Sequence, residues 1–341
     1  MPHPSPRITK NSADPFAIDF DHRPHGVEPL ASEPDFNPSL HLALEKPGEI
    51  ISLQDFGYSD DEIAACPSDF AATDIFRILS PEGAACLYEV SKQLEEFTTS
   101  NPRIQRNMRG GVYRSRFLRD LCMSPDVTAF ISDICGVELL PHTIPHQMGH
   151  LNYAPTTIGD NVDKWHVDTL RYDYVMFVTD PKKNQGGAFQ YYRGTKHEVA
   201  ALHQAGKPLD PAKIISPAMP GPGYAIMQQG NMVVHQAKGL TAAGERITMV
   251  NGYIPKDPHF PDFTRYDQLR FADPEEVVTA EYSRHIAIMG QKMLNDVFAQ
   301  DGFSANRMGY ADRLEAVAKH LQAAATQIRD SDSDTLEHFG D

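Results

Sequence analysis

The sequence lacks any long apolar run, and this absence argues against a membrane-spanning chain. No segment approaches the roughly 18 consecutive apolar residues that a spanning helix needs, and the densest run, 174–178, is only long enough for a strand. The first ten residues, MPHPSPRITK, also lack the apolar stretch of a secretory signal. We therefore expect no membrane partner and a cytoplasmic location.

Cysteine and positive charge are scarce as well. The 341 residues include four cysteines without a CxxC pair, which suits a reducing compartment better than a disulfide framework. Lys and Arg total 31 against 46 Asp and Glu, a formal net charge of −15. Because nucleic acids and anionic membranes bind basic surfaces, this balance argues against both as main partners. We expect a small-molecule substrate instead.

The residues that are present describe a globular body with extensions at both ends. Hydrophobic residues and the 23 glycines together make up roughly 48% of the chain, a value typical of a folded domain. Residues 1–50 hold nine of the 26 prolines and little hydrophobic periodicity, which predicts an extended N-terminal arm. Past Pro258 the pattern is helical, at about 274–300 and 310–329, before an acidic tail. For this C-terminal extension, 257–341, three roles stay open: a cover on the outer face of the core, a lid, or a homodimer interface.

Between these extensions the pattern changes from helical to strand-like. Residues 74–79 (DIFRIL) predict a strand, and Ser80-Pro81 begins a helix that runs to about Phe97. Ser124-Pro125 begins a second helix, which ends at Gly136. We therefore expect residues 51–136 to form a helical flank. Short segments rich in Val, Ile, Tyr and Phe then alternate with turn residues, at about 138–153, 172–179, 187–192, 213–216, 223–228, 231–235 and 246–254. This spacing favours a mainly β core, a sandwich or barrel, over 137–256.

The densest chemical motif is Trp165-His166-Val167-Asp168. In an extended segment, residues i and i+2 point to the same side, so His166 and Asp168 would project together. Two such ligands with a third from another strand form the 2-His-1-carboxylate triad of non-haem iron oxygenases. His-x-Asp alone is weak evidence for a metal site, because the same motif also occurs in capped turns.

A candidate third ligand, His235, follows Asp168 by 67 residues, and Arg246-Ile-Thr248 begins 11 residues later. Arg246 and Thr248 share one strand face, where a guanidinium and a hydroxyl can bind a carboxylate together. The combination is far more specific than any one part. The alternative is a set of ordinary polar residues on β-strands.

At these residues the sequence resembles the Fe(II)/2-oxoglutarate-dependent dioxygenases, and within them the phytanoyl-CoA dioxygenase and ectoine hydroxylase branch. The resemblance runs from about Ile75 to Ile254 and is clearest from His146 to Tyr253. Residues 146–155 resemble that branch's strand before the metal motif. Residues 174–180, Gly186-Gly187 and 193–197 (RGTKH) are similar to its next strand, Gly-rich turn and "GSHK" segment.

This resemblance implies a double-stranded β-helix, the jelly roll of the cupins. It implies Fe(II), 2-oxoglutarate and O₂ as cofactor and co-substrates, with His166, Asp168 and His235 binding iron. Arg246, together with Thr248, would bind the far carboxylate of 2-oxoglutarate, and Asn152 would contribute. Halogenating relatives lack the carboxylate, so Asp168 favours hydroxylation, although desaturation and cyclisation stay open. Two departures are Gln147, one residue too far from Asn152 to receive a role, and Thr195 in place of the usual Ser.

Other histidine patterns are weaker candidates for metal sites. His142, His146 and His150 recur every four residues, but Pro141 and Pro145 interrupt a helix there. On a strand the outer two would lie about 26 Å apart, too far for one ion. His197-Glu198 resembles a zincin motif, but the next histidine follows at +6 rather than the required +4.

Two further hypotheses use the same three ligands. A cupin-like metal-binding or sensing module would hold the ion without turnover, and a zinc hydrolase would use it for water activation. The oxoglutarate-type Arg246 argues against both.

The substrate is predicted less sharply. Residues 103–119 carry six arginines and no acid, and we expect Arg109, Arg114 and Arg116 to lie near a pocket mouth and pair with a substrate anion. The alternative is surface ion pairing with the excess acids. We also expect His150, and Tyr172 and Tyr191 from the two tyrosine pairs at 172/174 and 191/192, to line the pocket. A small carboxylate-bearing molecule such as an amino acid derivative is our hypothesis.

Overall fold

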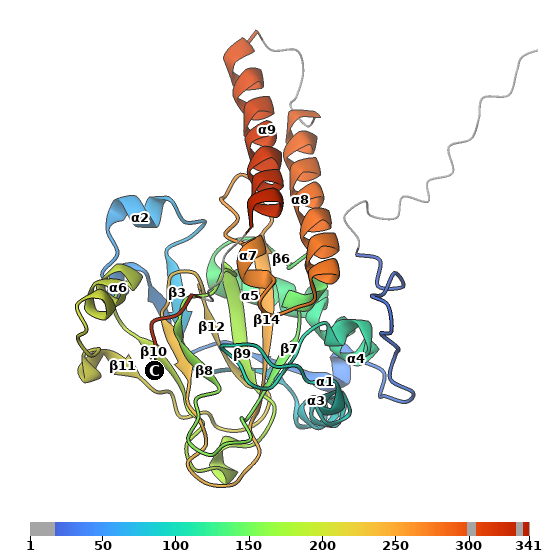
Figure 1. The fold of residues 1–341 in the computed structure, drawn as a ribbon, viewed down its shortest axis with the longest axis vertical. Helices are drawn as coiled ribbons and strands as arrows, with labels where there is room; N and C mark the ends of the chain where they lie inside the picture. The colour runs from blue at the N-terminus through green and yellow to red at the C-terminus, as the bar shows by residue number, and fades with distance from the viewer. Residues whose placement is uncertain (1–17, 299–304, 332–336, 341) are drawn as a thin grey trace, which may run out of the picture.

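Two antiparallel β-sheets with flanking helices form the body of the computed structural model (Figure 1), which describes residues 18–298, 305–331 and 337–340. The mainly β class with flanking helices is therefore confirmed. The strands are β1 Leu42–Glu45, β2 Ile50–Ser52, β3 Phe70–Thr73, β4 Phe76–Leu79, β5 Asn107–Met108, β6 Leu139–Pro141, β7 His150–Tyr153, β8 Asp163–His166, β9 Tyr172–Phe177, β10 Phe189–Tyr192, β11 Ile214–Ile215, β12 Tyr224–Gln228, β13 His235–Ala237 and β14 Ile247–Pro255. The α-helices are α1 Pro38–His41, α2 Asp60–Ala64, α3 Pro81–Leu94, α4 Arg116–Cys122, α5 Pro125–Cys135, α6 Lys196–Gln204, α7 Tyr266–Leu269, α8 Glu275–Phe298 and α9 Arg307–Asp330.

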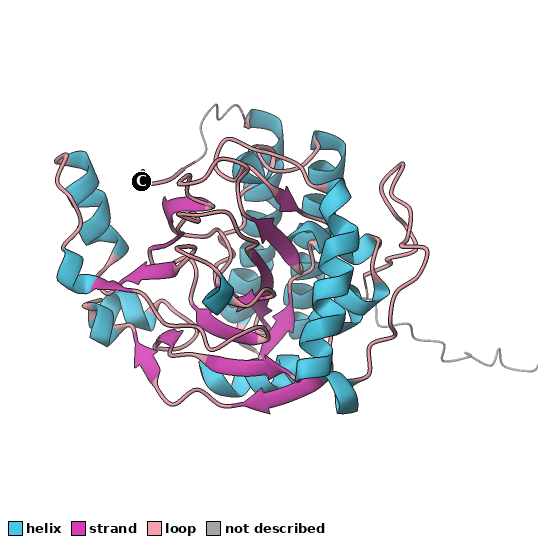
Figure 2. Ribbon diagram, turned by 90° about the horizontal axis from the view of Figure 1, so that it is seen from below, coloured by secondary structure: helices cyan, strands magenta, loops and turns pink. Residues whose placement is uncertain are grey.

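The larger sheet is a central layer with side chains buried on both faces. Its main path runs β1-β4-β12-β9-β14-β7-β5, while β2, β3 and β6 pair beside this path. Along β9, Tyr174 and Met176 pack among helices α3, α4 and α5, while Val175 and Phe177 pack toward the smaller sheet. Strand residues alternate between faces, so a strand covered on both sides is apolar throughout. Figure 2 shows the strands in the middle of the body with helices around them.

The smaller sheet has the order β11-β10-β13-β8, with β8 at its edge. Residues near the C-terminus lie along this edge: the Phe339 amide donates to the Trp165 carbonyl, and the Trp165 amide donates to the Gly340 carbonyl. The smaller sheet thus holds His166 on an edge strand that is itself covered by the end of the chain.

The predicted helix starts are confirmed. The Ser80 hydroxyl accepts from the Gly83 amide at the start of α3, and the Ser124 hydroxyl accepts from the Val127 amide at the start of α5. Gly136 ends α5 with a φ of 65°, the left-handed conformation that favours glycine.

Two predicted strands are wrong in part. The segment 138–153 is split into β6 and β7, because Pro145 begins a 3₁₀ turn between them. The segment 231–235 is not a strand, because the Met232 and Val233 amides both bond back to the Gln229 carbonyl in a tight turn. His235 therefore begins β13 instead of ending a strand.

The expected ranges of the arm and flank contain more sheet than the sequence indicated. Within 1–50, β1 pairs with β4, and the Glu33 carboxylate accepts from the amides of Arg116 and Phe117 at the start of α4. The range 51–136 supplies β3, β4 and β5 to the larger sheet as well as its helices. These strands are only two to four residues long, and their pairing depends on partners far away in the sequence.

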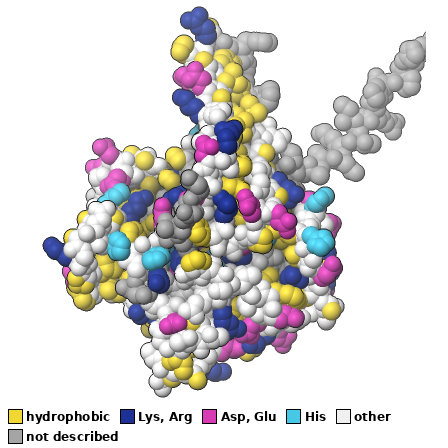
Figure 3. Space-filling model, in the orientation of Figure 1, with side chains coloured by type: hydrophobic (Ala, Val, Ile, Leu, Met, Phe, Trp, Pro, Cys, Tyr) yellow, Lys and Arg dark blue, Asp and Glu magenta, His cyan; other side chains and the backbone are white. Residues whose placement is uncertain are grey.

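Helices α8 and α9 form an antiparallel hairpin that projects from the body (Figure 1). Its base packs on α7 and Ile144 through Tyr282 and Ile286. Hydrophobic side chains are visible along the projecting part (Figure 3). The exposed large hydrophobic residues of α8 and α9 are Leu294, Met308, Leu314 and Leu321. The homodimer interface stays a prediction, and part of the predicted acidic tail, 332–336, lies outside the described residues. Over the described parts of the chain, every helix is too short or too polar to cross a membrane.

Candidate metal centre and its pocket

Strands β8 and β13 bring the three predicted ligands together. His235 pairs directly opposite His166 in the antiparallel register, and Asp168 follows the end of β8 by two residues. The Asp168 carboxylate lies 3.3 Å from Nε2 of His166 and 3.2 Å from Nε2 of His235. One ligand atom from each residue lies within 4.8 Å of the other two. This spacing fits a single metal ion.

Backbone carbonyls orient both imidazoles. Nδ1 of His166 lies 2.6 Å from the Lys164 carbonyl, and Nδ1 of His235 lies 3.0 Å from the Val233 carbonyl. A carbonyl only accepts, so each Nδ1 donates to its carbonyl and each Nε2 is the nitrogen left to bind a metal ion. Such a bond to the distal nitrogen is the usual way in which a protein fixes a metal-binding histidine.

The charges around the three ligands favour a cation. Burial alone would lower the pKa of His235, but Asp168 outweighs burial and raises that pKa to about 9. Burial would raise the pKa of Asp168, but His235 and His166 hold it well below its usual range. A divalent cation at this point would replace the proton shared by the two groups.

A further carboxyl group lies behind the ligands. Asp173 is completely buried, and burial together with the Asp168 charge raises its pKa well above the usual value. Its Oδ2 accepts from the Gln228 amide, which also lies 3.1 Å from Nε2 of His235. Sequence reasoning missed both residues, although Asp173 stands out as an acid within an otherwise apolar strand.

Arg246 is a buried cation with a free donor. The side chain is 1% exposed, and burial lowers its pKa to about 10. Nε donates to the Gly187 carbonyl at 2.7 Å, and Nη1 donates to the Thr248 hydroxyl at 3.3 Å. Nη2 is buried without a partner in the described residues. Since an unpaired buried donor is costly, the site calls for an acceptor, best an anion.

Arg246 and the three ligands line the same small chamber, of about 30 Å³. Asn152 and His150 also line it, and Asn152 Oδ1 and His150 Nδ1 are buried without partners in the described residues. Burial lowers the pKa of His150 to about 3, so its ring is neutral. The predicted residues Asn152, Thr248 and His150 thus lie together at one chamber.

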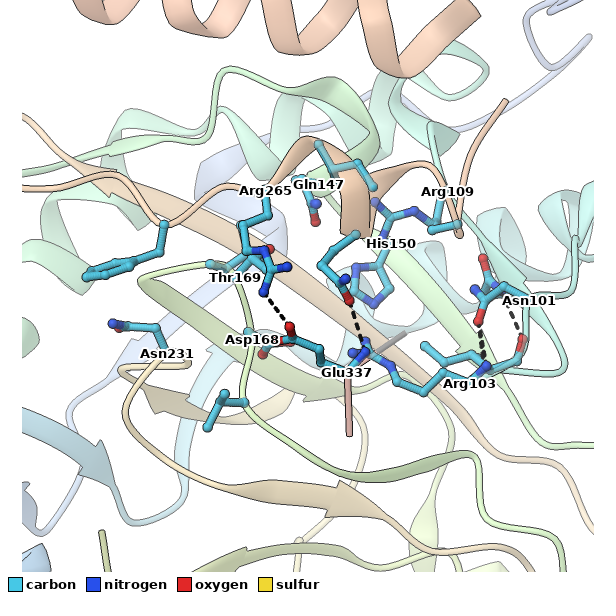
Figure 4. Close-up of a pocket in the computed structure, with 18 of the residues that line it drawn as sticks. Asn101, Arg103, Arg109, Gln147, His150, Asp168, Thr169, Asn231, Arg265 and Glu337 are labelled. Atoms are coloured by element: carbon cyan, nitrogen blue, oxygen red, sulfur yellow. Dashed lines mark hydrogen bonds and ion pairs between the residues drawn. The ribbon is translucent and has the colours of Figure 1, made fainter. Parts of the chain in front are cut away.

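The chamber leads into an outer pocket of about 320 Å³ (Figure 4). The two spaces share Arg103, His150, Asn152 and Asp168 in their walls. Residues 263–272 and Glu337 supply another part of the outer wall. A molecule in the outer pocket would therefore lie against the C-terminal extension and, through Asp168, against the metal centre.

Of the three arginines expected at a pocket mouth, only Arg109 lines this pocket. Arg114 instead stacks over the Phe97 ring, 3.8 Å from its centroid, and donates to the Glu28 carbonyl. Arg116 is 63% exposed and pairs with Glu33 and Asp35. Arg114 and Arg116 therefore lie outside the pocket, in packing and surface ion pairs, as the alternative for this stretch predicts.

The two predicted tyrosines lie away from the pocket. Tyr172 is buried among the helices, with its hydroxyl 3.2 Å from that of Ser68. Tyr191 packs between the sheets, stacked on Phe56. The expectation was wrong for Tyr172 because it lies on the face of β9 that packs on the helices, whereas Asp173 and Val175 on the opposite face line the inner chamber. On β10 the residue that lines the chamber is Phe189, two positions before Tyr191.

Sequence reasoning also missed Arg103, Lys196 and Asp163. Arg103 Nε lies 2.9 Å from Asp163 Oδ1, and Asp163 lies 3.5 Å from Nε2 of His166. Lys196 lines the outer pocket from the start of α6. The sequence signals for these residues are weak. Arg103 is one of six arginines in the stretch 103–119, and Asp163 differs from other acids only in lying three residues before His166.

The weaker histidine candidates have other partners. His142 stacks on His285, and His146 contacts the Glu281 carboxylate at 2.7 Å. His197 contacts Glu62 at 3.0 Å on the surface. Over the described residues, only His166, Asp168 and His235 form a group with metal-ligand spacing.

No family model matches the sequence, and no curated protein sequence matches it. Solved structures do resemble the fold. AviO1 from Streptomyces viridochromogenes Tue57 has a TM-score of 0.43 and 15% identity over 63% of this chain and 98% of that chain. EctD from S. alaskensis, with 2-oxoglutarate and 5-hydroxyectoine, has a TM-score of 0.41 and 16% identity over 65% and 82%.

The alpha-ketoglutarate-dependent epimerase SnoN from nogalamycin biosynthesis has a TM-score of 0.39 and 13% identity over 52% of this chain and 74% of that chain. The solved structures that resemble this chain also include a 2OG-Fe(II) oxygenase family member from Burkholderia pseudomallei. SnoN, as an alpha-ketoglutarate-dependent enzyme, and the Burkholderia protein, as a 2OG-Fe(II) oxygenase, carry the chemistry of the family that the sequence motifs resemble. At TM-scores below 0.5 the likeness is partial, and the function proposed below rests on the geometry of the site.

Proposed function

We propose that this protein is an Fe(II)/2-oxoglutarate-dependent oxygenase that hydroxylates, or otherwise oxidises at a C–H bond, a small carboxylate-bearing molecule. The observation that carries the proposal is the pairing of a 2-His-1-carboxylate group with a buried arginine whose Nη2 lacks a partner in the described residues, in one chamber. The first feature fits iron with open coordination positions, and the second fits a co-substrate carboxylate. The double-stranded β-helix is the fold that we infer from the two antiparallel sheets.

The residues present fit the iron and the co-substrate. His166, Asp168 and His235 would hold Fe(II) through two imidazole nitrogens and one carboxylate oxygen. When bound, iron and 2-oxoglutarate supply oxidation by O₂ coupled to decarboxylation of 2-oxoglutarate to succinate. Arg103, His150 and Asn152 line both the chamber and the outer pocket, so the co-substrate would lie against these side chains.

The protein's own residues have separate tasks in this proposal. Arg246 binds the far carboxylate of 2-oxoglutarate through Nη2, while its bonds to Gly187 and Thr248 fix the direction of the guanidinium. Asn152 lines the same chamber, and its Nδ2, 3.3 Å from Nε2 of His150, is the donor from which a carboxylate could accept. The covered walls of the chamber exclude bulk water and thereby strengthen these polar contacts.

Two alternatives use the same ligands without 2-oxoglutarate. A cupin-like binding or sensing module needs the three metal ligands but has no need for Arg246. A zinc hydrolase likewise needs the three ligands but has no need for Arg246. The buried, partly unpaired Arg246 therefore favours the oxygenase over both.

The test is anaerobic reconstitution of the full chain with Fe(II) and 2-oxoglutarate. Wild type should develop the weak visible charge-transfer band of a chelated keto acid, and Asp168→Ala and His235→Ala should abolish it. Arg246→Gln should weaken 2-oxoglutarate binding about 10- to 100-fold, the loss of a charge-assisted hydrogen bond, with iron binding changed little. His259→Ala, at an exposed histidine paired with Asp296, is the control that keeps the band.

Succinate release over a broad panel of small molecules completes the test. A wild-type chain that shows neither the band nor succinate release contradicts the oxygenase. Tight metal binding without either supports the binding module, and equal loss of iron and 2-oxoglutarate in Arg246→Gln contradicts the role given to Arg246.

A further inference from the structure

The outer pocket contains four cationic side chains, and their partners differ. Arg103 pairs with Asp163, and Arg265 pairs with Asp267 and Glu337. Lys196 donates to the Asn231 carbonyl at 3.1 Å and to the Met232 sulfur at 3.4 Å. Among the described residues of this pocket, Arg109 has a carboxylate anchor at Nε and a separate buried nitrogen, Nη2, without a partner.

Arg109 is anchored by one edge of its guanidinium. Its Nε lies 3.0 Å and 2.8 Å from the two carboxylate oxygens of Asp273, and the two side chains are 10% and 4% exposed. Nη2 of Arg109 is buried and has no partner in the described residues. Because the anchor uses only Nε, the outer part of the guanidinium is left for a ligand.

The position of Arg109 suits a substrate contact rather than a co-substrate contact. Arg109 lines the outer pocket but not the inner chamber, whereas Asp168 lines both. In Figure 4, Arg109 lies beyond His150 as seen from Asp168. A molecule bound by Arg109 would thus extend across the pocket toward the metal centre.

The anchor comes from the C-terminal extension. Asp273 lies between α7 and α8, 164 residues from Arg109, and residues 263–272 form part of the same pocket wall. The rest of the lining is mixed. It includes the amides of Asn101, Gln147 and Asn231 and the apolar side chains of Ile104, Leu170 and Phe263. This mixture suits a small organic molecule with one charged end.

We propose that the substrate is an organic acid whose carboxylate is bound by Arg109, and that Asp273 is a positioning residue that holds Arg109 for this contact. The inference rests on the proposed function, since it assigns the substrate class of the same site. It gives the C-terminal extension a role in substrate recognition. One free buried donor suits a singly charged carboxylate better than a phosphate, which requires several donors.

The experiment compares small organic acids with their own primary amides, using the full chain. Succinate release with Fe(II) and 2-oxoglutarate gives KM and kcat, and the melting temperature of the chain without added iron gives binding independently of turnover. Wild type should prefer the acid about 10- to 100-fold over the amide in KM, the range for a hydrogen bond to a charged group. The acid should also raise the melting temperature more than the amide does.

Four variants assign the contact. Arg109→Gln should reduce the acid-to-amide preference to about one, and Arg109→Lys should restore part of it. Asp273→Asn should raise KM for the acid by less than Arg109→Gln and leave kcat within about twofold, the pattern of lost positioning in binding. Arg116→Gln, at an exposed arginine of the same stretch that is not in the pocket, should keep the wild-type preference.

The outcomes separate this inference from the proposed function. A wild type that binds and turns over amides as well as acids overturns the inference while the oxygenase stands. An acid preference that persists in Arg109→Gln also overturns it, and its loss in Lys196→Gln would then move the contact to Lys196. A wild type without a charge-transfer band or succinate release overturns the proposed function, whereas the melting-temperature comparison still tests the acid site.

Discussion

At the scale of single residues, the absence of a side chain at Gly230 leaves space for the carboxyl groups of Asp168 and Asp173. A Cβ added at this position would come within 2.2 Å of Asp173 Oδ1 and 3.1 Å of Asp168 Oδ2. The Gly230 carbonyl also accepts the Asp168 amide at 2.9 Å. The backbone at Gly230 thus positions a metal ligand, and the missing side chain leaves room for the carboxyl group behind it.

Gly230→Ala should therefore disturb the metal centre. Asp173 would have to move, and its bond to Gln228 would carry the displacement toward His235. We expect metal affinity to fall at least about tenfold and the free energy of unfolding to fall by about 1–3 kcal/mol, as for other overpacked sites. Metal titration and urea unfolding measure the two effects.

Gly221→Ala is the matched control, because a Cβ at Gly221 meets nothing within 4 Å. It should leave both quantities close to wild type. A Gly230→Ala chain that binds metal as wild type does would show that Asp173 has space to move, contrary to this account.

The sequence predicts part of this site at residue scale, and the reason is local spacing. His166 and Asp168 are separated by one residue, and so are Arg246 and Thr248, so the geometry of an extended chain places each pair together. The roles of Asp163 and Asp173 depend on which faces are covered, and the contact of Arg109 with Asp273 spans 164 residues. A single sequence carries no pattern for such a contact.

At the scale of elements, a buried carboxylate on helix α8, Glu281, bonds to the core in addition to the apolar contacts at the base of the hairpin. Glu281 accepts from the Tyr113 hydroxyl at 2.9 Å and from the His146 amide at 3.0 Å, and it contacts His146 Nδ1 at 2.7 Å. Burial alone would lower the pKa of His146, but the bond to Glu281 and its charge outweigh burial and raise that pKa. The charged form of His146 is therefore the form that stabilises the docking of α8.

This docking should make stability depend on pH. Because the pKa of His146 is higher in the folded state, its contribution is complete below about 6.5, the unfolded value, and is lost as pH rises through the folded value. His146→Gln should cost about 1–3 kcal/mol at pH 6 and progressively less from pH 7 to 9. Urea unfolding at each pH measures the difference from wild type.

His142→Gln is the control for this prediction. Burial lowers the pKa of His142 to about 3, so this ring stays neutral over the same pH range. Its replacement should change stability by the same amount at every pH from 6 to 9. A His146→Gln difference that does not vary with pH would mean that His146 is neutral and that Glu281 acts without a charged partner.

The elements themselves could be predicted where a local feature defines their ends. The starts of α3 and α5 follow from Ser-Pro, because the serine cap and the proline act within one turn. The start of β13 could not be predicted in this way. The apolar residues before it form a turn instead of a strand, and in that turn the Met232 carbonyl accepts a hydrogen bond from the Tyr58 hydroxyl, 174 residues away. Strand ends here depend on tertiary contacts.

At the scale of the whole molecule, the C-terminal extension contributes to the pocket rather than standing apart from it. Residues 263–272 and Glu337 line the outer pocket, and residues 337–340 then continue along β8. The sequence alone leaves a cover, a lid and a dimer interface open as roles for this extension. Its contact with the pocket could not be predicted, because charged and aromatic residues in a tail carry no periodicity that indicates their partners.

The contact of residues 339–340 with β8 can be tested through the fluorescence of Trp165. Phe339 packs against the apolar cluster that contains Trp165, the only tryptophan in the chain, and the backbones of Phe339 and Gly340 bond to the backbone carbonyl and amide of Trp165. Trp165 is 5% exposed. Removal of residues 337–341 should expose the indole and shift its fluorescence emission to longer wavelength. The free energy of unfolding should fall by about 1–3 kcal/mol, from two backbone hydrogen bonds of about 1 kcal/mol each and part of a buried phenyl ring.

Two point variants separate the parts of this effect. Phe339→Ala keeps the backbone bonds and removes the ring, so it should reproduce most of the fluorescence shift but only part of the stability loss. Met308→Ala, at a side chain that is 61% exposed on α9, should change neither the emission nor the unfolding free energy by more than a few tenths of a kcal/mol. If the truncated chain keeps the emission and the stability of the full chain, then residues 337–340 do not cover β8 in solution. The edge strand that carries His166 would then have no partner on that side.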